Sequence, residues 1–291
     1  MDEIKFTVVI PLYNKENSIL STLKSVLEQT YKNFELIVVN DGSTDKSLKV
    51  IEHLRDDRIR IVDKENGGVS SARNEGIKLA KFPWIALLDG DDLWLPNFLE
   101  MICSMIMEYP NAAIIAVGWN YEDGSYKFPI NSKGYIDNYF AVSLKGSVLS
   151  SSSIVIRNSC FEEVGFFNEG LSYGEDLEMW CRLSGKFKIA FLPISLSIYR
   201  VMTENRACTV RKMDISRHFA YNLSLKNSYS KDEKKYYRKI IRDCMMQCIK
   251  FEGKQNIYAL MRKHGKREIL FDFVLLNINR ILNLLSLPQI R

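Results

Sequence analysis

The first 95 residues alternate between short apolar runs and segments with helical spacing, and this alternation restricts the possible folds strongly. The apolar runs lie at 6–10, 34–39, 59–62 and 84–88, and the helical segments at 16–29, 46–55 and 69–81. Strands that alternate with helices form βαβ units around a parallel sheet. The sequence therefore predicts an α/β fold with a Rossmann-like, mostly parallel central sheet.

Polar residues follow each of the four predicted strands. Tyr13 comes after the first, Asp41 after the second, the turn Asn66-Gly67-Gly68 after the third and Asp89 after the fourth. Right-handed crossovers bring the ends of such strands to one edge of the sheet, where open α/β folds bind ligands. We therefore expect these residues to meet in one cleft.

Three carboxylates in four residues, Asp89, Asp91 and Asp92, follow the fourth apolar run. Grouped carboxylates repel one another and are costly to desolvate without a cation. Their oxygens suit hard divalent ions such as Mg²⁺ or Mn²⁺. The stretch predicts a metal held against a phosphate-bearing ligand; the alternative is an acidic turn that caps a helix after Pro96.

The usual glycine-rich phosphate loops are missing. Residues 11–16 read Pro-Leu-Tyr-Asn-Lys-Glu where a dinucleotide-binding fold has Gly-x-Gly-x-x-Gly, and no Walker A loop occurs. A nucleotide would therefore be held by carboxylates and a metal.

The chain after residue 95 continues the mixed pattern. Its expected helices are 96–109 and 175–184, its expected strands are 112–119, 154–156, 189–192 and 197–200, and Asp123-Gly124 is an expected hairpin turn. Glu175 and Asp176 open the second helix. Acids in a first helical turn complement the helix dipole, so capping is the alternative to a chemical role for this pair.

The cysteines and the N-terminus indicate a cytoplasmic protein. None of the six cysteines forms a Cys-x-x-Cys pair, so we expect reduced thiols and no zinc site. Residues 1–5 are acidic and enter a strand directly, unlike a signal peptide. No run of about 18 uncharged apolar residues predicts a transmembrane helix.

Charge divides the chain unevenly. Residues 1–210 carry a net charge of −6 and residues 211–291 one of +11. We expect a catalytic domain at 1–205 and a basic helical extension at 206–291, with a basic cluster at 262–267 and apolar helical spacing at 271–285. Such an extension suits a membrane surface; docking on the catalytic domain or on a second copy in a homodimer is the alternative. Nucleic acid is not expected, because no recognised motif accompanies the charge.

Five motifs occur in a characteristic order. They are Val9-Ile10-Pro11-Leu12-Tyr13-Asn14, Val39-Asn40-Asp41-Gly42-Ser43-Thr44-Asp45, Asn66-Gly67-Gly68 with Ala72-Arg73-Asn74-Glu75-Gly76, Leu88-Asp89-Gly90-Asp91-Asp92, and Gly174-Glu175-Asp176. Together they resemble the inverting family 2 glycosyltransferases of the GT-A fold, over about residues 5–205. Such enzymes use a nucleotide-diphosphate sugar, commonly a UDP-sugar, with Mn²⁺ or Mg²⁺.

The resemblance implies a role for each matching residue. Nucleotide-sugar binding falls to Pro11, Tyr13, Asn14, Asp41, Asn66, Gly67, Arg73, Asp89 and Gly90, with Asp41 on the base. Metal binding falls to Asp89, Asp91 and Asp92. Asp176 is the implied general base, with Glu175 as the neighbouring alternative, and Trp180 is either an acceptor contact or a core residue.

The implied reaction transfers one hexosyl or N-acetylhexosaminyl group to a hydroxyl of a saccharide. We expect a lipid-linked acceptor, such as a polyprenyl-diphosphate saccharide, in surface polysaccharide synthesis at the inner face of the plasma membrane. The Gln-x-x-Arg-Trp signature of processive synthases is missing, and Met202 stands where many relatives have a histidine; His218 is a substitute or a core residue. Two alternatives remain: a catalytically silent nucleotide-sugar-binding protein and a sugar nucleotidyltransferase.

Overall fold

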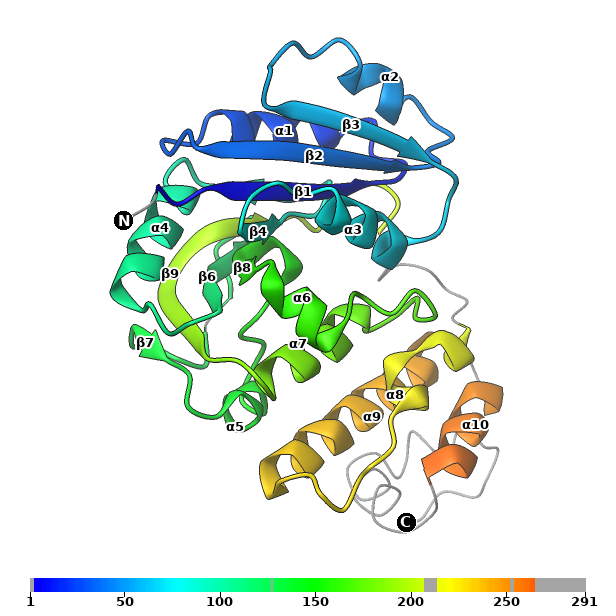
Figure 1. The fold of residues 1–291 in the computed structure, drawn as a ribbon. Coiled ribbons are helices and arrows are strands. Elements are labelled where there is room, and N and C mark those ends of the chain that lie inside the picture. The colour runs from blue at the N-terminus through cyan, green and yellow to red at the C-terminus, as the bar shows by residue number, and fades with distance from the viewer. Residues whose placement is uncertain (1–2, 127, 207–213, 252–253, 265–291) are drawn as a thin grey trace. The chain divides into compact units, whose positions relative to one another are not determined.

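The computed structural model describes residues 3–126, 128–206, 214–251 and 254–264 of the 291-residue chain (Figure 1). Contacts divide the chain into two units. The first unit holds Met1–Glu169 and Glu175–Arg206, and the second holds Gly170–Gly174 and Ala207–Arg291. The division lies next to the expected domain boundary at residue 205, but the short segment before Glu175 belongs to the second unit.

A nine-stranded sheet runs through the first unit. Its strands are β1 (Phe6–Leu12), β2 (Phe34–Asp41), β3 (Ile59–Lys64), β4 (Trp84–Leu87), β5 (Leu93–Trp94), β6 (Ile114–Tyr121), β7 (Gly134–Tyr135), β8 (Ile154–Arg157) and β9 (Ile189–Tyr199). The order is β3-β2-β1-β4-β8-β6-β9-β5, with β7 also beside β9 (Figure 1). The long ladders are parallel: β1 pairs with β2 and β4, β2 with β3, and β6 with β9. The antiparallel pairs are short, so the predicted mostly parallel α/β sheet is confirmed.

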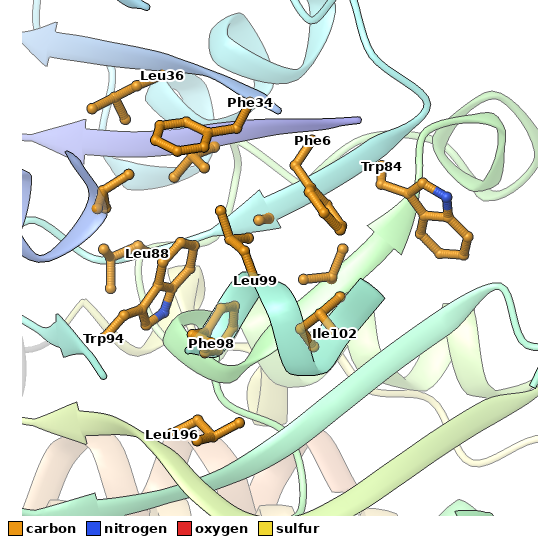
Figure 2. Close-up of a cluster of buried hydrophobic side chains, with 14 of the residues drawn as sticks. Phe6, Phe34, Leu36, Trp84, Leu88, Trp94, Phe98, Leu99, Ile102 and Leu196 are labelled. Carbon is orange, nitrogen blue, oxygen red and sulfur yellow. The ribbon is translucent and has the colours of Figure 1, made fainter. Parts of the chain in front are cut away.

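Helices cover both faces of this sheet. They are α1 (Ile19–Leu27), α2 (Ser47–Ile51), α3 (Val69–Lys78), α4 (Phe98–Glu108), α5 (Tyr139–Ser143), α6 (Ser159–Val164) and α7 (Glu175–Ser184). The main core cluster joins α1, α2 and α4 to one face, and Figure 2 shows Trp94 and Phe98 stacked within it at 4.0 Å between ring centroids. On the other face, Ala72 of α3 packs against Ile37 and Val39.

Helix α3 lies unusually close to β1. A Cβ atom on Gly76 would come within 2.4 Å of Val9 Cγ1, so only glycine allows this approach without rearrangement. The helix begins at Val69, directly after the turn that follows β3, at the carboxyl edge of the parallel strands. This packing fixes the first turn of α3, and with it Arg73, beside the expected ligand-binding edge.

Two local expectations were wrong. The two expected closing strands are one strand, β9, whose pairing with β6 shifts register near Gly118. Pro193 lies inside β9 and has no N–H to donate to a neighbouring strand. Asp123-Gly124 forms a turn, with the Gly124 N–H donating to the Tyr121 carbonyl, but β7 pairs with β9 and not with β6, so the expected hairpin does not form.

The second unit is helical where the structure describes it. It contains a 3₁₀ turn at Ile215–Arg217 and helices α8 (Phe219–Asn222), α9 (Lys231–Phe251) and α10 (Lys254–His264). Apolar side chains of α9 are buried, including Ile241 and Cys248. The stretch 271–285 lies outside the described residues. Among the described helices, none is long and apolar enough to cross a membrane.

Candidate active site

The loop after β1 is tied to the loop after β2 by Asn14. Its Nδ2 donates to Thr44 Oγ1 at 3.2 Å, and its Oδ1 accepts from the Thr44 N–H at 2.7 Å. Asn14 has a φ of 51°, a left-handed conformation that asparagine tolerates better than most residues. This arrangement leaves the neighbouring Tyr13 side chain 38% exposed at the carboxyl edge of the sheet.

Asp41 organises the turn after β3. Its Oδ1 accepts from the Gly67 N–H at 2.9 Å, and its Oδ2 accepts from the Gly68 N–H at 2.8 Å. Lys64 Nζ pairs with the same carboxylate at 2.8 Å, and Asn66 Nδ2 donates to the Asp41 carbonyl at 2.8 Å. The structure therefore brings Asp41, Asn66 and Gly67 together; their contact with a nucleotide stays a prediction.

Asp89 and Asp91 each face a cation of the protein. Asp89 Oδ1 lies 2.7 Å from Arg73 Nη2, and Asp91 Oδ2 lies 2.6 Å from Lys15 Nζ. Gly90 between them approaches the Pro11 carbonyl so closely that an added Cβ would lie 2.9 Å from that oxygen. These contacts hold residues 89–92, which we call the acidic loop, against the end of β1.

Asp92 is buried and hydrogen-bonded. Its Oδ2 accepts from Ser152 Oγ at 2.5 Å and its Oδ1 from the Arg200 N–H at 3.1 Å. Burial, followed by repulsion from Asp89, raises the pKa of Asp92 well above its usual range. This carboxylate is occupied in joining the acidic loop to residues just before β8 and just after β9; its share in metal binding stays a prediction.

Arg73 connects two acidic segments that are distant in sequence. Besides Asp89, its guanidinium contacts Glu175 Oε1 at 3.1 Å, and the Arg73 side chain is only 4% exposed. Desolvation and the charge of Asp176 raise the pKa of Glu175 to about 7. Desolvation also raises the pKa of Asp176, whose Oδ1 accepts from the Leu177 N–H at 2.7 Å. The two candidate general bases, Glu175 and Asp176, and the acidic loop thus meet around one arginine.

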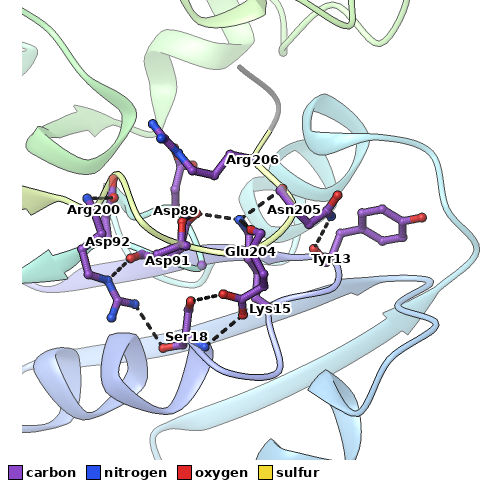
Figure 3. Close-up of polar contacts among 12 residues, drawn as sticks. Tyr13, Lys15, Ser18, Asp89, Asp91, Asp92, Arg200, Glu204, Asn205 and Arg206 are labelled. Carbon is purple, nitrogen blue, oxygen red and sulfur yellow. Dashed lines mark hydrogen bonds and ion pairs between the residues drawn. The ribbon is translucent and has the colours of Figure 1, made fainter. Parts of the chain in front are cut away.

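A segment after β9 lies across the acidic loop and the start of α1 (Figure 3). Arg200 Nε donates to the Asp91 carbonyl, and Thr203 Oγ1 donates to Asp91 Oδ2 at 2.8 Å. The Glu204 carboxylate accepts from the Ser18 N–H at 3.1 Å and from Ser18 Oγ at 2.7 Å. We call residues 200–205 the strap.

Comparison with known proteins identifies the family. A profile described as "Glycosyl transferase family 2" matches residues 7–165, more than half of the chain. The chain belongs to glycosyl transferase family 2. An "Uncharacterized glycosyltransferase" of Rickettsia bellii is 34% identical over 206 residues, which are 70% of this chain and 30% of that protein. Streptococcus pneumoniae "Glycosyltransferase GlyG" is 30% identical over 211 residues, 67% of this chain and 70% of the relative.

Several relatives match this chain over only part of their own length. The chain spans about a third of three Rickettsia relatives, 30%, 33% and 34% of their lengths. Escherichia coli "UDP-Glc:alpha-D-GlcNAc-diphosphoundecaprenol beta-1,3-glucosyltransferase WfgD" is 39% identical over 109 residues, 37% of this chain and 43% of WfgD. Staphylococcus aureus TarS, residues 1–349 in complex with UDP-GlcNAc, superposes with a TM-score of 0.63 at 19% identity, covering 96% of this chain and 73% of TarS. The predicted GT-A type of fold is confirmed.

The family 2 site has oxygen donors suited to a divalent ion. Asp89 and Asp91 supply hard carboxylate oxygens, which Mn²⁺ and Mg²⁺ prefer. Across the described ranges, no three His, Cys, Asp or Glu side chains are grouped as a ready metal site. Lys15 and Arg73 instead neutralise the two aspartates. The donor chemistry fits a divalent ion at Asp89 and Asp91, although each now contacts a protein cation.

Trp180 and His218 occupy core positions. Trp180 is fully buried and packs edge-on against Phe167, with ring centroids 6.1 Å apart. This favours the core alternative over the predicted acceptor contact. In the second unit, His218 Nδ1 accepts from the Ala220 N–H at 2.9 Å and so caps α8. Its burial likewise favours a structural role.

Several contacts of the acidic loop were not predicted from the sequence. They are made by Lys15, by Ser152 and by the strap, which includes Arg200. Lys15 directly follows the motif that ends at Asn14, and a lysine there was the available signal. Ser152 and Arg200 lie 60 and 108 positions from Asp92. No local pattern links such distant residues, because β8 and β9 reach the acidic loop only through the sheet order.

Proposed function

We propose that this family 2 chain is an inverting glycosyltransferase that moves one sugar from a UDP-sugar to a hydroxyl of a saccharide. One observation carries the proposal: Arg73 joins Asp89, on the implied donor side, to Glu175, which neighbours the implied base Asp176. The acids that the reaction requires on its donor and acceptor sides therefore converge on a single buried cation.

Asp176 is the proposed general base. A sugar hydroxyl is a weak nucleophile at neutral pH, so a carboxylate must take its proton during attack. The acceptor oxygen forms a bond to the anomeric carbon, the bond from that carbon to the diphosphate breaks, and the electron pair leaves with the nucleoside diphosphate. Attack from the side opposite the leaving group inverts the anomeric configuration.

Glu175 has a different proposed role. Its carboxylate is paired with Arg73 at 3.1 Å, whereas the Asp176 carboxylate accepts from the Leu177 N–H. Glu175 therefore positions the guanidinium, and Asp176 takes the proton from the acceptor hydroxyl. A charge on Asp176 is favoured by the nearby Arg73, which offsets part of the effect of desolvation.

Asp89 and Asp91 would hold the divalent ion. Mn²⁺ or Mg²⁺ supplies positive charge that stabilises the departing diphosphate. Asp41 and the turn 66–68 would receive the base and ribose, with Tyr13 exposed beside them. The carboxyl edge of the parallel strands places these groups together.

The proposed substrates follow the relatives' chemistry. WfgD is named for transfer from UDP-glucose to a diphosphoundecaprenol-linked GlcNAc, and TarS was solved with UDP-GlcNAc. We infer a UDP-hexose or UDP-N-acetylhexosamine donor and a polyprenyl-diphosphate-linked acceptor in surface polysaccharide synthesis. This acceptor would place the enzyme at the cytoplasmic face of the membrane, with the basic residues of 206–291 toward anionic lipid.

The test is a panel of nucleotide sugars with and without Mn²⁺, followed by thermal shift and by transfer to a lipid-linked saccharide. We expect Asp176→Asn to keep the donor-induced shift and to lose transfer by about 10²-fold or more. Asp91→Asn should lose the Mn²⁺-dependent part of the shift. Asp57→Asn, at an exposed loop position, is the matched control and should change neither.

The competing functions give different results in this panel and in a separate incubation with an NTP and a sugar 1-phosphate. A silent binding protein would show UDP-dependent shifts and no transfer with any donor. A nucleotidyltransferase would release diphosphate from an NTP and a sugar 1-phosphate. Either result would replace the transferase proposal.

A further inference from the structure

Lys15 fills an oxygen cage at the acidic loop (Figure 3). Its Nζ lies 2.6 Å from Asp91 Oδ2, 2.6 Å from the Glu204 carbonyl and 3.2 Å from the Asn205 carbonyl. An ammonium group has three N–H donors, and here each has an oxygen acceptor. The Lys15 side chain is 11% exposed, so this is a partly desolvated, fully coordinated cation.

The Asp91 carboxylate in this cage is suited to a metal ion. Carboxylate oxygens are ligands of hard divalent cations. Thr203 Oγ1 adds a hydroxyl at 2.8 Å from Asp91 Oδ2, the oxygen that Lys15 also contacts. A cation arriving at this oxygen must therefore compete with the Lys15 ammonium for the same lone pairs.

The cage also fastens the strap. Two of the three Lys15 acceptors are strap carbonyls, from Glu204 and Asn205. The Glu204 carboxylate accepts from the N–H groups of Asn17 and Ser18 at 3.0 and 3.1 Å, where α1 begins. Asn205 Nδ2 donates to the Tyr13 carbonyl at 3.1 Å. The strap is thus bound to the loop 13–18, which carries residues that the proposed function assigns to the donor.

We propose that Lys15 is an internal counter-ion that competes with the divalent ion for Asp91 and that couples metal binding to release of the strap. The inference rests on the proposed function for the metal at Asp91. Lys15 neutralises Asp91 and holds the strap carbonyls as long as its ammonium stays in the cage. Once Lys15 is displaced, Glu204 and Asn205 lose their shared donor, and the loop 13–18 becomes accessible.

A titration of Mn²⁺ alone tests the competition. Free Mn²⁺ is followed by its electron paramagnetic resonance signal, with no nucleotide sugar present, for the wild type, Lys15→Met and Lys24→Met. Lys24 is a matched control, because it lies on α1 with a 72% exposed side chain. We expect Lys15→Met to bind Mn²⁺ about tenfold more tightly than the wild type, because the Lys15 ammonium no longer competes with Mn²⁺ for the Asp91 carboxylate. Lys24→Met should bind as the wild type does.

Equal or weaker Mn²⁺ binding by Lys15→Met, or no binding by either protein, would overturn the inference. A measurement on the wild type guards against a variant that fails to fold. Hydrogen exchange at the Asn17 amide, which donates to the Glu204 carboxylate at 3.0 Å, should speed up several-fold on adding Mn²⁺. Unchanged exchange at saturating Mn²⁺ would contradict the coupling.

The outcomes separate this inference from the proposed function. The titration contains no donor, so Lys15-dependent Mn²⁺ binding without transfer in the donor panel would refute only the transferase. Transfer activity with Mn²⁺ affinity that is indifferent to Lys15 would refute only the competition.

Discussion

At the scale of single residues, two cations of the protein neutralise three of the acids in the site. Arg73 serves Asp89 and Glu175, and Lys15 serves Asp91. Arg73 is the more constrained of the two cations, because its side chain is 4% exposed and its guanidinium also lies 5.3 Å from the Phe167 ring centroid. Removing such a cation leaves buried carboxylates without compensation, which costs more than the pair itself contributes.

We predict that Arg73→Met lowers the free energy of unfolding by about 3 kcal/mol, because Glu175 loses its partner in a desolvated position. The measurement is urea denaturation at pH 7.5. Arg73→Met/Glu175→Gln should recover part of the loss. Lys133→Met is the control, since the Lys133–Glu108 pair is exposed at 43% and 48% and its loss should change stability far less. If Arg73→Met lowered the free energy of unfolding as little as the Lys133→Met control, the role of Arg73 in holding Asp89 and Glu175 would be contradicted.

At the scale of elements, close packing overrides helix propensity in α3. Glycine inside a helix is normally unfavourable relative to alanine by about 1 kcal/mol. Here Gly76 faces Val9 of β1, and an added Cβ would lie 2.4 Å from Val9 Cγ1. The close approach of α3 to β1 places Arg73 at the carboxyl edge of the sheet. Gly76 therefore contributes indirectly to the position of Arg73.

Gly76→Ala should therefore destabilise the protein, by about 1–3 kcal/mol, although propensity alone predicts the opposite sign. Thermal or urea denaturation measures the change. Val9→Ala/Gly76→Ala should be less affected by the added methyl group than the single substitution, because the shortened Val9 side chain makes room for it. A stabilising Gly76→Ala substitution would show that α3 does not rest on β1 as described.

Helix α8 depends on a neutral histidine. His218 Nδ1 accepts the Ala220 N–H, and burial lowers the pKa of His218 to about 4. The ordinary value of 6.5 applies when the chain unfolds. The unfolded state thus binds more protons between these two values, so the contribution to stability is present above about pH 6.5 and is lost as the pH falls toward 4.

We expect hydrogen exchange in α8, corrected for its intrinsic pH dependence, to show this loss between pH 6.5 and 4, equivalent to at most about 3 kcal/mol. His218→Asn keeps a side-chain acceptor for the cap and cannot titrate in this range. Its α8 protection should change less with pH. Identical pH profiles for the two proteins would contradict the role given to His218.

At the scale of the whole molecule, the charge asymmetry is the feature that the fold leaves unexplained. Residues 1–210 have a net charge of −6 and residues 211–291 one of +11. Attraction to an anionic surface falls with ionic strength, because salt screens exposed charges beyond about 10 Å at 0.1 M. The membrane-surface proposal therefore predicts a strongly salt-dependent association.

We expect the full chain to float with vesicles that contain anionic lipid at low salt, to dissociate at about 0.5 M NaCl, and not to bind neutral vesicles. Vesicle flotation measures all three. Replacing Arg262 and Lys263, in the last turn of α10, by glutamine should weaken flotation severalfold. The control is the replacement of the exposed Lys24 and Lys32 by glutamine. Equal flotation with neutral and anionic vesicles would refute the electrostatic explanation.

The sequence by itself determined the alternating α/β organisation, because helical spacing and β-branched runs are local properties of the chain. It also determined that Asp41, Asn66 and Asp89 end up at one edge, since parallel strands joined by right-handed crossovers have no other arrangement. The family resemblance rested on the same local motifs, and the profile match over 7–165 bears it out.

Only the tertiary structure decided which charges meet. Arg73 bridges Asp89 and Glu175, and Lys15 contacts Asp91 together with strap residues from 189 and 190 positions away. Such pairs depend on strand order and on the path of the chain after β9, which leave no periodic trace in the sequence. The burial of Trp180 likewise favours a core position over an acceptor contact, and the sequence pattern of an apolar helix face is the same in either case.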